Sequence, residues 1–389
     1  MSAVWRRMNV IQWDRRRTQQ LIVAVVILCL VLYFLLPTGS TRRSPYAPTY
    51  KVRHKLSHWH TEIQKNDTLF KLVTEQKFLH PDSSAAFKQY FRPQVSLNKL
   101  DLKKDADLKD FNIDVDVIVY LHIQKVGGTT FNNHLINDLD KGFNCGCTKD
   151  VITNPCLCKN KNGYIWLFSW FTVGWPCGLH ADWTMLHECI DTAMNDLEEQ
   201  TRKRRYFYIT LLRDPVSRYL SEWQHQRLGQ HWEDAKLQCG GKRVELFDIR
   251  PCFYDTWHGV SLDEFMECRD NLALNRQTRM IADLTKSNCY YRRGITPEKR
   301  AEAQLESAKQ NLLQMPFFGL TERQTETQHL FEKTFGRKFK TSFTYLNDAE
   351  EEDMISEDEF MHLMQHIELD MQLYLYAAEL FKEKLRTVI

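Results

Sequence analysis

Residues 115–139 read VDVIVYLHIQKVGGTTFNNHLINDL, and this stretch decides the fold. It opens with an apolar run that is typical of a buried strand. The next residues, QKVGGTT, predict a tight loop in which two glycines let a ligand approach the backbone. The last residues begin a helix, whose first N–H groups and positive dipole end face that loop. The sequence therefore predicts a strand, a loop and a helix that together bind an anion such as a phosphate-like group.

The position of the lysine in this loop distinguishes two classes of enzyme. Lys125 precedes Gly127 and Gly128, whereas in a Walker A loop the lysine follows the second glycine. The order argues against a Walker-type nucleotide-binding loop. Lys125 and the hydroxyl groups of Thr129 and Thr130 add hydrogen-bond donors for the same anion.

A second unit of the same kind follows further along the chain. Residues 206–212 predict a strand, Asp214 predicts the N-cap of a helix and Pro215 its first residue. In a parallel sheet, ligands bind at the carboxyl ends of the strands. We therefore expect both loops to open on one crevice, where Arg213 and Ser221 suit a second phosphate at the far end of a nucleotide.

Strands that alternate with helices favour a parallel sheet with helices on both faces, which is an α/β fold. The other elements predicted from start and stop signals are a helix over residues 297–314, a strand over residues 316–320, a helix capped by Thr321, and one helix after the capping box of Ser356 and Glu359, with apolar residues from Phe360 to Phe381.

Composition sets broad limits on function. The chain has 389 residues, 43% of them hydrophobic, and a formal net charge of +2. A net charge this small gives no strong positive field over the whole protein that would attract nucleic acid, so nucleic acid is not predicted as a partner. The residues after the first hundred or so are enough for one large domain or two small ones.

The N-terminal region carries a membrane signal. Leu21–Leu36 is an unbroken apolar run of 16 residues, which spans about 24 Å as a helix. Arginines are more frequent before this run than after it, so the positive-inside rule places the N-terminus in the cytosol. The segments expected are a cytoplasmic tail over residues 1–20, a transmembrane signal anchor over residues 21–37, a lumenal stem over residues 38–112 and a catalytic domain over residues 113–389.

The alternative to an anchor is a cleaved signal peptide, with residues 38–40 as the processing site. The apolar run is longer than usual for such a peptide and begins later in the chain, which favours the anchor. Asn66 begins the only N-x-S/T glycosylation sequon, in agreement with a lumenal stem.

Ten cysteines lie outside the apolar run, an even number that suits disulfides in an oxidising lumen. Cys145 and Cys147 form one Cys-x-Cys pair, and Cys156 and Cys158 form another. These four could instead bind zinc, but zinc ribbons prefer Cys-x-x-Cys spacing. We therefore expect disulfides, and the sequence leaves their connectivity open.

Five motifs carry a closer resemblance. They are LHIQKVGGTTF over residues 121–131, GLHADWT over residues 178–184, LRDPVSRYLSEW over residues 212–223, RQTRM over residues 276–280 and FFGLTE over residues 317–322. Together they resemble the heparan sulfate 6-O-sulfotransferases, over residues 113 to about 345. The resemblance implies a P-loop-like sulfotransferase fold, in which a central parallel sheet is flanked by helices, with an N-terminal membrane anchor.

The resemblance also implies a chemistry. It implies a Golgi enzyme, single-pass type II with a lumenal catalytic domain, that moves the sulfuryl group of 3′-phosphoadenosine 5′-phosphosulfate to the 6-hydroxyl of glucosamine in heparan sulfate. The implied partners are this polysaccharide and the Golgi membrane, and the reaction requires no metal. The alternatives are a sulfotransferase for another glycan position, a lumenal kinase, and a heparan-binding protein with a degenerate donor site.

The same resemblance assigns roles to residues of this chain. His180 matches the catalytic base, and a neutral histidine with a pKa near 6.5 can accept a proton from a sugar hydroxyl. From its local sequence alone, His180 would be interpreted as a structural histidine packed among aromatic residues. Lys125 is expected to stabilise the leaving phosphate. The implied donor-binding residues are His122, Ile123, Gln124, Lys125, Val126, Gly127, Gly128, Thr129, Thr130, Arg213, Ser221, Thr344 and Tyr345. The implied substrate-binding residues are Trp170, Trp175, His180, His225 and Trp232.

Three positions depart from the family's pattern. Val126 stands for the usual threonine, Trp170 stands for an arginine that faces the acidic substrate, and residues 154–155 replace a basic pair. We expect slightly weaker donor binding from the first change and fewer charge contacts to heparan sulfate from the others. Our hypothesis is that the missing positive charge comes from Lys149, Lys159, Lys161 or the run Arg202–Arg205.

Overall fold

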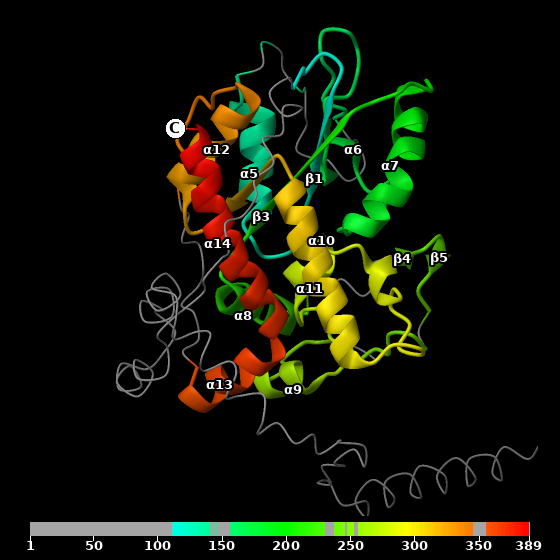
Figure 1. The fold of residues 1–389 in the computed structure, drawn as a ribbon, viewed down its shortest axis with the longest axis vertical. Coiled ribbons are helices and arrows are strands. Elements are labelled where there is room, and N and C mark those ends of the chain that lie inside the picture. The colour runs from blue at the N-terminus through cyan, green and yellow to red at the C-terminus, as the bar shows by residue number, and fades with distance from the viewer. Residues whose placement is uncertain are drawn as a thin grey trace, which may run out of the picture. The chain divides into compact units, whose positions relative to one another are not determined.

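A four-stranded sheet lies at the centre of the structure (Figure 1). The structure is a computed structural model that describes residues 111–140, 142, 145, 156–229, 237–245, 247–252, 256–344 and 355–388, all within the compact unit His58–Ile389. All neighbouring strands are parallel, which confirms the predicted α/β class. In sheet order, the strands are β2 (Leu167–Phe168), β1 (Val117–Leu121), β3 (Tyr206–Leu212) and β6 (Phe317–Leu320).

Helices cover both faces of this sheet, because successive residues of a strand point to opposite sides. Phe207 of β3 contacts Phe335 with ring centroids 6.4 Å apart, while the next residue, Tyr208, stacks on His187 at 4.2 Å. The helices on the Phe207 side are α5 (Gly128–Asn133) and α12 (Gln324–Phe335), and those on the Tyr208 side are α7 (Trp183–Glu198) and α14 (Glu368–Val388).

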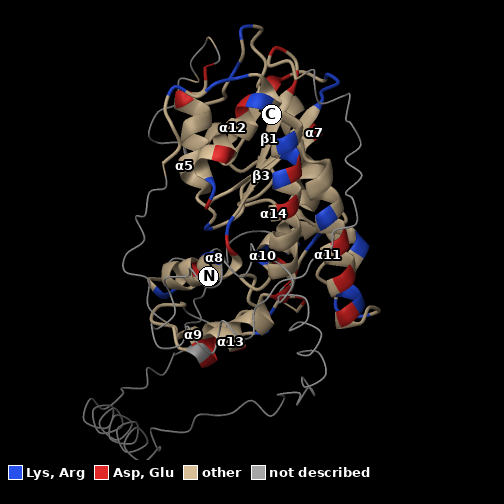
Figure 2. Ribbon diagram, turned by 60° about the vertical axis from the view of Figure 1, so that its left-hand side comes forward, with Lys and Arg blue, Asp and Glu red and all other residues tan. Residues whose placement is uncertain are grey.

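Further helices and a hairpin complete the described residues. Charged residues of both signs alternate along α11 (Figure 2), so its outer face is well suited to water. These elements are η4 (His134–Asp138), α6 (Trp170–Val173), α8 (Pro215–Arg227), β4 (Gln238–Cys239), β5 (Lys242–Arg243), α9 (Leu262–Glu267), α10 (Arg276–Ile281), η5 (Leu284–Ser287), α11 (Pro297–Gln314) and α13 (Glu357–His366).

Both predicted strand–loop–helix units are confirmed. All five residues of β1 are buried, as expected for a central strand of a parallel sheet. The second strand spans the predicted residues, and α8 begins at Pro215 behind an N-cap in which the carboxylate of Asp214 accepts the N–H of Ser217 at 2.8 Å. The helix predicted over residues 297–314 is also confirmed as α11.

The prediction that Thr321 caps a helix is wrong. Helix α12 begins at Gln324, and its N-cap is Arg323. The hydroxyl of Thr321 lies instead 2.7 Å from the carbonyl oxygen of Val126 and 3.0 Å from that of Leu212. It ties the loop after β1 to the ends of β3 and β6, a role that depends on residues far away in the sequence.

The C-terminal segment is two helices, where the sequence predicted one. The capping box at the start of α13 is confirmed, but this helix ends before Ile367 and α14 begins at the next residue. The N–H groups of Leu369 and Asp370 donate to Oδ1 of Asn275 at 2.9 and 3.1 Å. A distant side chain thus caps the second helix, and the apolar period alone could not reveal the break.

The described cysteines form disulfides. The Cys-x-Cys cluster includes the bridge Cys145–Cys158, and Cys156 is disulfide-bonded as well. The other bridges are Cys177–Cys189, Cys239–Cys289 and Cys252–Cys268. The prediction of disulfides is therefore confirmed, and these four bridges supply connectivity that the sequence left open.

Several predictions fall outside the described residues. They concern the membrane anchor, most of the stem, Lys149, and the residues Asn66, Trp232 and Tyr345. Within the part of the chain that the structure describes, no helix has both the length and the apolar character needed to cross a bilayer.

Removing single bridges tests how this unit is stabilised. A disulfide restricts the unfolded chain, and the cost of losing it grows with the loop that it closes. Cys239–Cys289 has a sequence separation of 50 and Cys177–Cys189 one of 12. Replacing both cysteines of a bridge with alanine should lower the free energy of unfolding by about 4 kcal/mol for the first and about 3 kcal/mol for the second. Urea unfolding followed by tryptophan fluorescence measures both, and a larger loss for the shorter loop would contradict the prediction.

Candidate functional site

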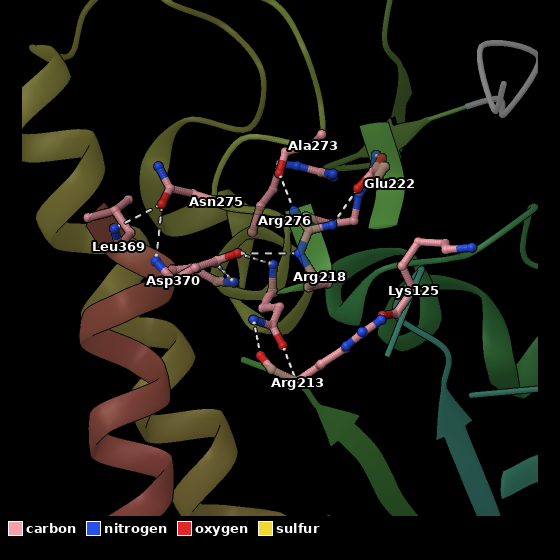
Figure 3. Close-up of polar contacts among 12 residues, drawn as sticks. Lys125, Arg213, Arg218, Glu222, Ala273, Asn275, Arg276, Leu369 and Asp370 are labelled. Atoms are coloured by element: carbon pink, nitrogen blue, oxygen red, sulfur yellow. Dashed lines mark hydrogen bonds and ion pairs between the residues drawn. The ribbon is translucent and has the colours of Figure 1, made fainter. Parts of the chain in front are cut away.

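The two predicted loops meet at the carboxyl edge of the sheet (Figure 3). The guanidinium of Arg213, after β3, donates through Nη1 to the carbonyl oxygen of Lys125, after β1, at 3.2 Å. The carboxylate of Glu322, after β6, accepts the N–H of Asp214 at 2.7 Å. Segments that follow three different strands are therefore joined at one place.

The first loop has an unusual backbone conformation. Lys125 and Gly127 both adopt the left-handed conformation, with φ of 64° and 78°. A non-glycine residue held in this way costs on the order of 1–3 kcal/mol, and such residues cluster at functional sites. A Cβ at Gly128 would clash with the ring of His122 and lie 2.7 Å from the hydroxyl of Tyr120. The first glycine is thus required by conformation and the second by space.

The remaining side chains of this loop differ in where they lie. Ile123 and Val126 are fully buried in the core. The departure from threonine at Val126 therefore concerns a buried side chain. Gln124 is also buried, Thr129 is exposed and Thr130 is half-buried.

Two further donor-site predictions lie at separate places. Ser221 is half-buried on α8, about two turns after Arg213. Thr344 is exposed and directly follows Phe343, whose ring packs on Phe131 of α5 at 5.9 Å. The structure therefore places Ser221 on the helix that follows the second loop, and Thr344 in the segment after α12 that packs against α5.

His180 lies against the first loop. Its Nδ1 is 3.2 Å from the carbonyl oxygen of His122. Nδ1 therefore carries the proton of the neutral ring, and Nε2 is the acceptor nitrogen. Burial lowers the pKa of His180 to about 4. The hydrogen bond to His122 acts in the opposite direction, because it favours the charged ring. The ring is neutral as predicted, but its pKa lies below the value near 6.5 expected from the sequence.

Aromatic side chains surround His180. The ring of Trp170 lies 6.5 Å from that of His180 and 6.3 Å from that of Trp175. Trp175 is 44% exposed, although tryptophan is usually well buried. Burial, and then the charge of Lys125, lower the pKa of His225. The structure thus brings Trp170, Trp175 and His225 into the surroundings of His180 and Lys125.

Lys125 and Arg213 form a pair of neighbouring cations. Burial, and then the positive charge of Arg213, lower the pKa of Lys125. Two cations held together at a half-buried site repel each other and attract an anion. In the described ranges, no group of three or more His, Cys, Asp or Glu side chains is placed to hold a metal ion.

A buried ion cluster lies behind these cations (Figure 3). Glu222 of α8 accepts hydrogen bonds from Arg218, one turn earlier, and from Nε of Arg276 on α10 at 2.8 Å. Burial alone would raise the pKa of Glu222, but the charges of Arg276 and Arg218 lower it to about 2. Asp370 of α14 lies 3.9 Å from Arg218. Two guanidinium groups and two carboxylates from three helices therefore neutralise one another.

The starts of α10 and α14 cap each other. Asp370 of α14 accepts the N–H of Gln277 at 3.1 Å and that of Thr278 at 2.8 Å, both in the first turn of α10. In return, Asn275 accepts the first N–H groups of α14, as described above (Figure 3). A residue at the start of each helix thus accepts N–H groups at the start of the other. Those N–H groups have no acceptor within their own helix.

Gln277 connects this pair of helices to the site. Its Oε1 accepts the N–H of Arg213 at 2.9 Å, and its Nε2 donates to the carbonyl oxygen of the same residue at 2.9 Å. One carboxamide thereby holds both backbone polar groups of Arg213. The placement of this arginine depends on α10 and, through Asp370, on α14.

Sequence reasoning assigned no role to Glu222, Gln277 or Asp370. The spacing of Arg218 and Glu222, four residues apart on one helix face, was the available signal. The other partner of Glu222 is 54 residues away, so local spacing could not show that the pair is buried.

The basic run at residues 202–205 lies away from the site. Arg202 and Arg204 both pair with Glu198, at 2.8 and 2.7 Å, and Arg205 pairs with Asp116 at 2.7 Å. These residues precede β1 and β3, so they lie at the amino edge of the sheet, opposite His180. The geometry does not support the prediction that this run supplies charge to the site.

The sulfotransferase family model matches residues 110–377, and the chain belongs to this family. It is similar to heparan-sulfate 6-O-sulfotransferase 1 of Homo sapiens, at 43% identity over 304 residues, 76% of this chain and 71% of that protein. It is also similar to heparan-sulfate 6-O-sulfotransferase 1-B of Danio rerio, at 42% identity over 310 residues, 79% of this chain and 74% of that protein. The family match includes both loops, His180 and the buried ion cluster.

Glu222→Gln tests the ion cluster. The change keeps the shape of the side chain but leaves Arg218 and Arg276 with less negative charge, so the free energy of unfolding should fall by about 3–5 kcal/mol. Glu326→Gln is the matched control, because Glu326 pairs with Arg323 on the surface of α12, and such pairs contribute about 1 kcal/mol or less. Urea unfolding measures both variants. Equal losses would show that the cluster has no special role in stability.

Proposed function

We propose that this chain is a heparan sulfate 6-O-sulfotransferase that uses 3′-phosphoadenosine 5′-phosphosulfate as its donor. The observation that carries the proposal is the meeting of Lys125, Arg213 and His180 at one edge of the sheet. It occurs in a chain that is 42–44% identical to proteins named heparan-sulfate 6-O-sulfotransferases.

The residues at this edge fit the donor, which carries negative charge at both ends. Lys125 and the N–H groups at the start of α5 would hold the phosphosulfate. Arg213 and Ser221 would hold the 3′-phosphate, while Thr344 and Tyr345 would close the adenine side. The repulsion between Lys125 and Arg213 supports this assignment, because an anion between them relieves it.

When bound, the donor supplies a sulfuryl group whose bond to the phosphate oxygen breaks as a bond to the acceptor oxygen forms. Nε2 of His180 accepts the proton of the acceptor hydroxyl. The hydrogen bond from Nδ1 to the carbonyl oxygen of His122 holds the ring in place and stabilises its charged form. Lys125 stabilises the negative charge that develops on the phosphate.

The acceptor polysaccharide would bind on the aromatic side of His180. The exposed ring of Trp175 offers an apolar face with a polar edge, which suits a sugar. Trp170, His225 and Trp232 are the other residues we assign to acceptor binding. Because Trp170 cannot form an ion pair, the charged groups of the acceptor need other partners.

The same proposal places the enzyme in the Golgi membrane as a single-pass type II protein. The disulfides of the described residues support an oxidising lumen. Asn66 would carry a glycan on the lumenal stem. The proposed segments are the tail over residues 1–20, the signal anchor over residues 21–37, the stem over residues 38–112 and the catalytic domain over residues 113–389.

The position of the transferred sulfate tests the function. Incubation of the full chain with labelled donor and heparan sulfate, followed by disaccharide analysis, should place the label on the 6-hydroxyl of glucosamine. His180→Ala should lower the rate by about 10²–10⁴-fold, the usual contribution of a general base, with little change in donor binding. His187→Ala, an exposed histidine on α7, is the matched control and should keep full activity. Label at another position would refute the proposed specificity, and full activity of His180→Ala would remove it as the base.

The pH dependence tests the state of His180. The base acts when it is neutral, so activity falls as pH drops through its pKa. Because burial lowers the pKa of His180 to about 4, kcat/KM for the donor should stay level from neutral pH to about pH 5 and fall below that. Circular dichroism at each pH would show that the protein remains folded. A fall in kcat/KM centred near pH 6.5 would show that the ring is not buried as described.

A further inference from the structure

His180 lines two separate cavities. The smaller, of about 30 Å³, includes the side chains of Trp170 and Trp175. The larger, of about 480 Å³, is lined by Gln124 from the loop after β1 and by residues of α10. The larger volume falls within the range of small-molecule pockets, about 300–1,000 Å³. The larger cavity therefore offers room for a ligand group beside His180.

The lining of the larger cavity carries more positive than negative charge. Four arginines line it, against two carboxylates, Glu245 and Asp270. Asp270 is already paired with Arg292 and accepts the N–H of Arg250 at 3.0 Å. An anionic group is thus the ligand that this lining favours.

Arg279 is held against the cavity by hydrogen bonds to neutral groups. Its Nη2 donates to the carbonyl oxygen of Leu272 at 2.9 Å and its Nη1 to the hydroxyl of Tyr290 at 3.2 Å. Tyr290 in turn donates to Asp182 at 3.3 Å. These bonds fix the guanidinium plane while using only two of its three nitrogens. By contrast, Arg276 is balanced by Glu222.

Apart from Oδ1 of Asp270, which forms an ion pair with Arg292, two buried polar atoms in the lining have no hydrogen-bond partner among the described residues. They are Oε1 of Gln124 and Nε of Arg279, in side chains that are only 4% and 9% exposed. One is an acceptor and the other is a donor. Each such atom costs about 1–3 kcal/mol unless something pairs with it. A ligand that carries both a hydroxyl and an anionic oxygen would satisfy both atoms.

We propose that the larger cavity is an acceptor subsite for an anionic sugar residue next to the glucosamine that is sulfated. In it, Nε–H of Arg279 donates to a carboxylate or sulfate oxygen, and Oε1 of Gln124 accepts from a sugar hydroxyl. This inference rests on the proposed function, since heparan sulfate carries such anions beside each glucosamine. It also supplies a partner for acceptor charge in a chain where Trp170 cannot pair with it.

The test compares Arg279→Gln and Arg279→Lys with the unchanged full chain on matched acceptors. One acceptor is a heparan oligosaccharide with its anions intact. The second has its uronate carboxyl groups reduced to alcohols, and the third has its sulfates removed. Initial rates give KM and kcat for each acceptor, and KM for the donor serves as an internal control.

Arg279→Gln should raise KM for the intact acceptor about tenfold with little change in kcat or in KM for the donor. The ratio of the variant's KM to the KM of the unchanged chain should shrink toward one on the acceptor that lacks the recognised anion. The acceptor on which this happens shows whether Arg279 binds a carboxylate or a sulfate. Arg279→Lys should recover part of the loss. An equal rise in KM on all three acceptors, or no rise on any, would overturn the subsite. Failure of the proposed function would look different, because the unchanged chain would then not sulfate the 6-hydroxyl of any acceptor.

A second variant decides the matter if Arg279→Gln does not fold. Arg243 is exposed on β5 and lines the cavity, whereas the adjacent exposed Lys242 does not. Arg243→Ser should raise KM for the intact acceptor more at low salt than at high salt, and Lys242→Ser should leave it unchanged. The same effect from both variants, or none from either, would refute the assignment.

Discussion

The carboxylate of Glu222, enclosed by two guanidinium groups, is the interaction on which the site depends. It joins α8, which follows the strand that ends before Arg213, to Arg276 at the start of α10. A buried charge that loses its partner keeps the cost of its desolvation, so the two helices cannot slide without a large penalty. This constraint sets α8 against α10 in one register. The carboxamide of Gln277 is therefore held within hydrogen-bond distance of the backbone of Arg213.

The C-terminal helix belongs to the site for the same reason. Asp370 accepts N–H groups at the start of α10 and also faces Arg218, so it serves both the cap and the ion cluster. Because the cluster contains two cations and two anions, it adds little net charge behind Lys125 and Arg213. The positive field of these two residues thus remains available to a ligand at the sheet edge.

The parts of the fold that local sequence determines were predictable. Asp214 and Pro215 place the start of α8, because a cap and a first helical residue are neighbours in the chain. Thr321 was misassigned, since a threonine before a helix commonly caps it, whereas its actual contacts lie 195 and 109 residues away. The role of His180 came from the resemblance and not from its neighbours. Its low pKa could not be predicted, because burial is a property of the whole fold.

The electrostatics of the free site give the proposed reaction an order. Without a ligand, burial keeps His180 neutral and makes it a weak base. An anion held by Lys125 and Arg213 would bring negative charge toward the ring, which would favour the charged imidazole and raise the pKa of His180. A general base works best when its pKa is near the working pH. A neutral sugar hydroxyl brings no such charge. Proton transfer is therefore favoured only after the donor is in place, which couples deprotonation of the acceptor to the presence of the group that it will receive.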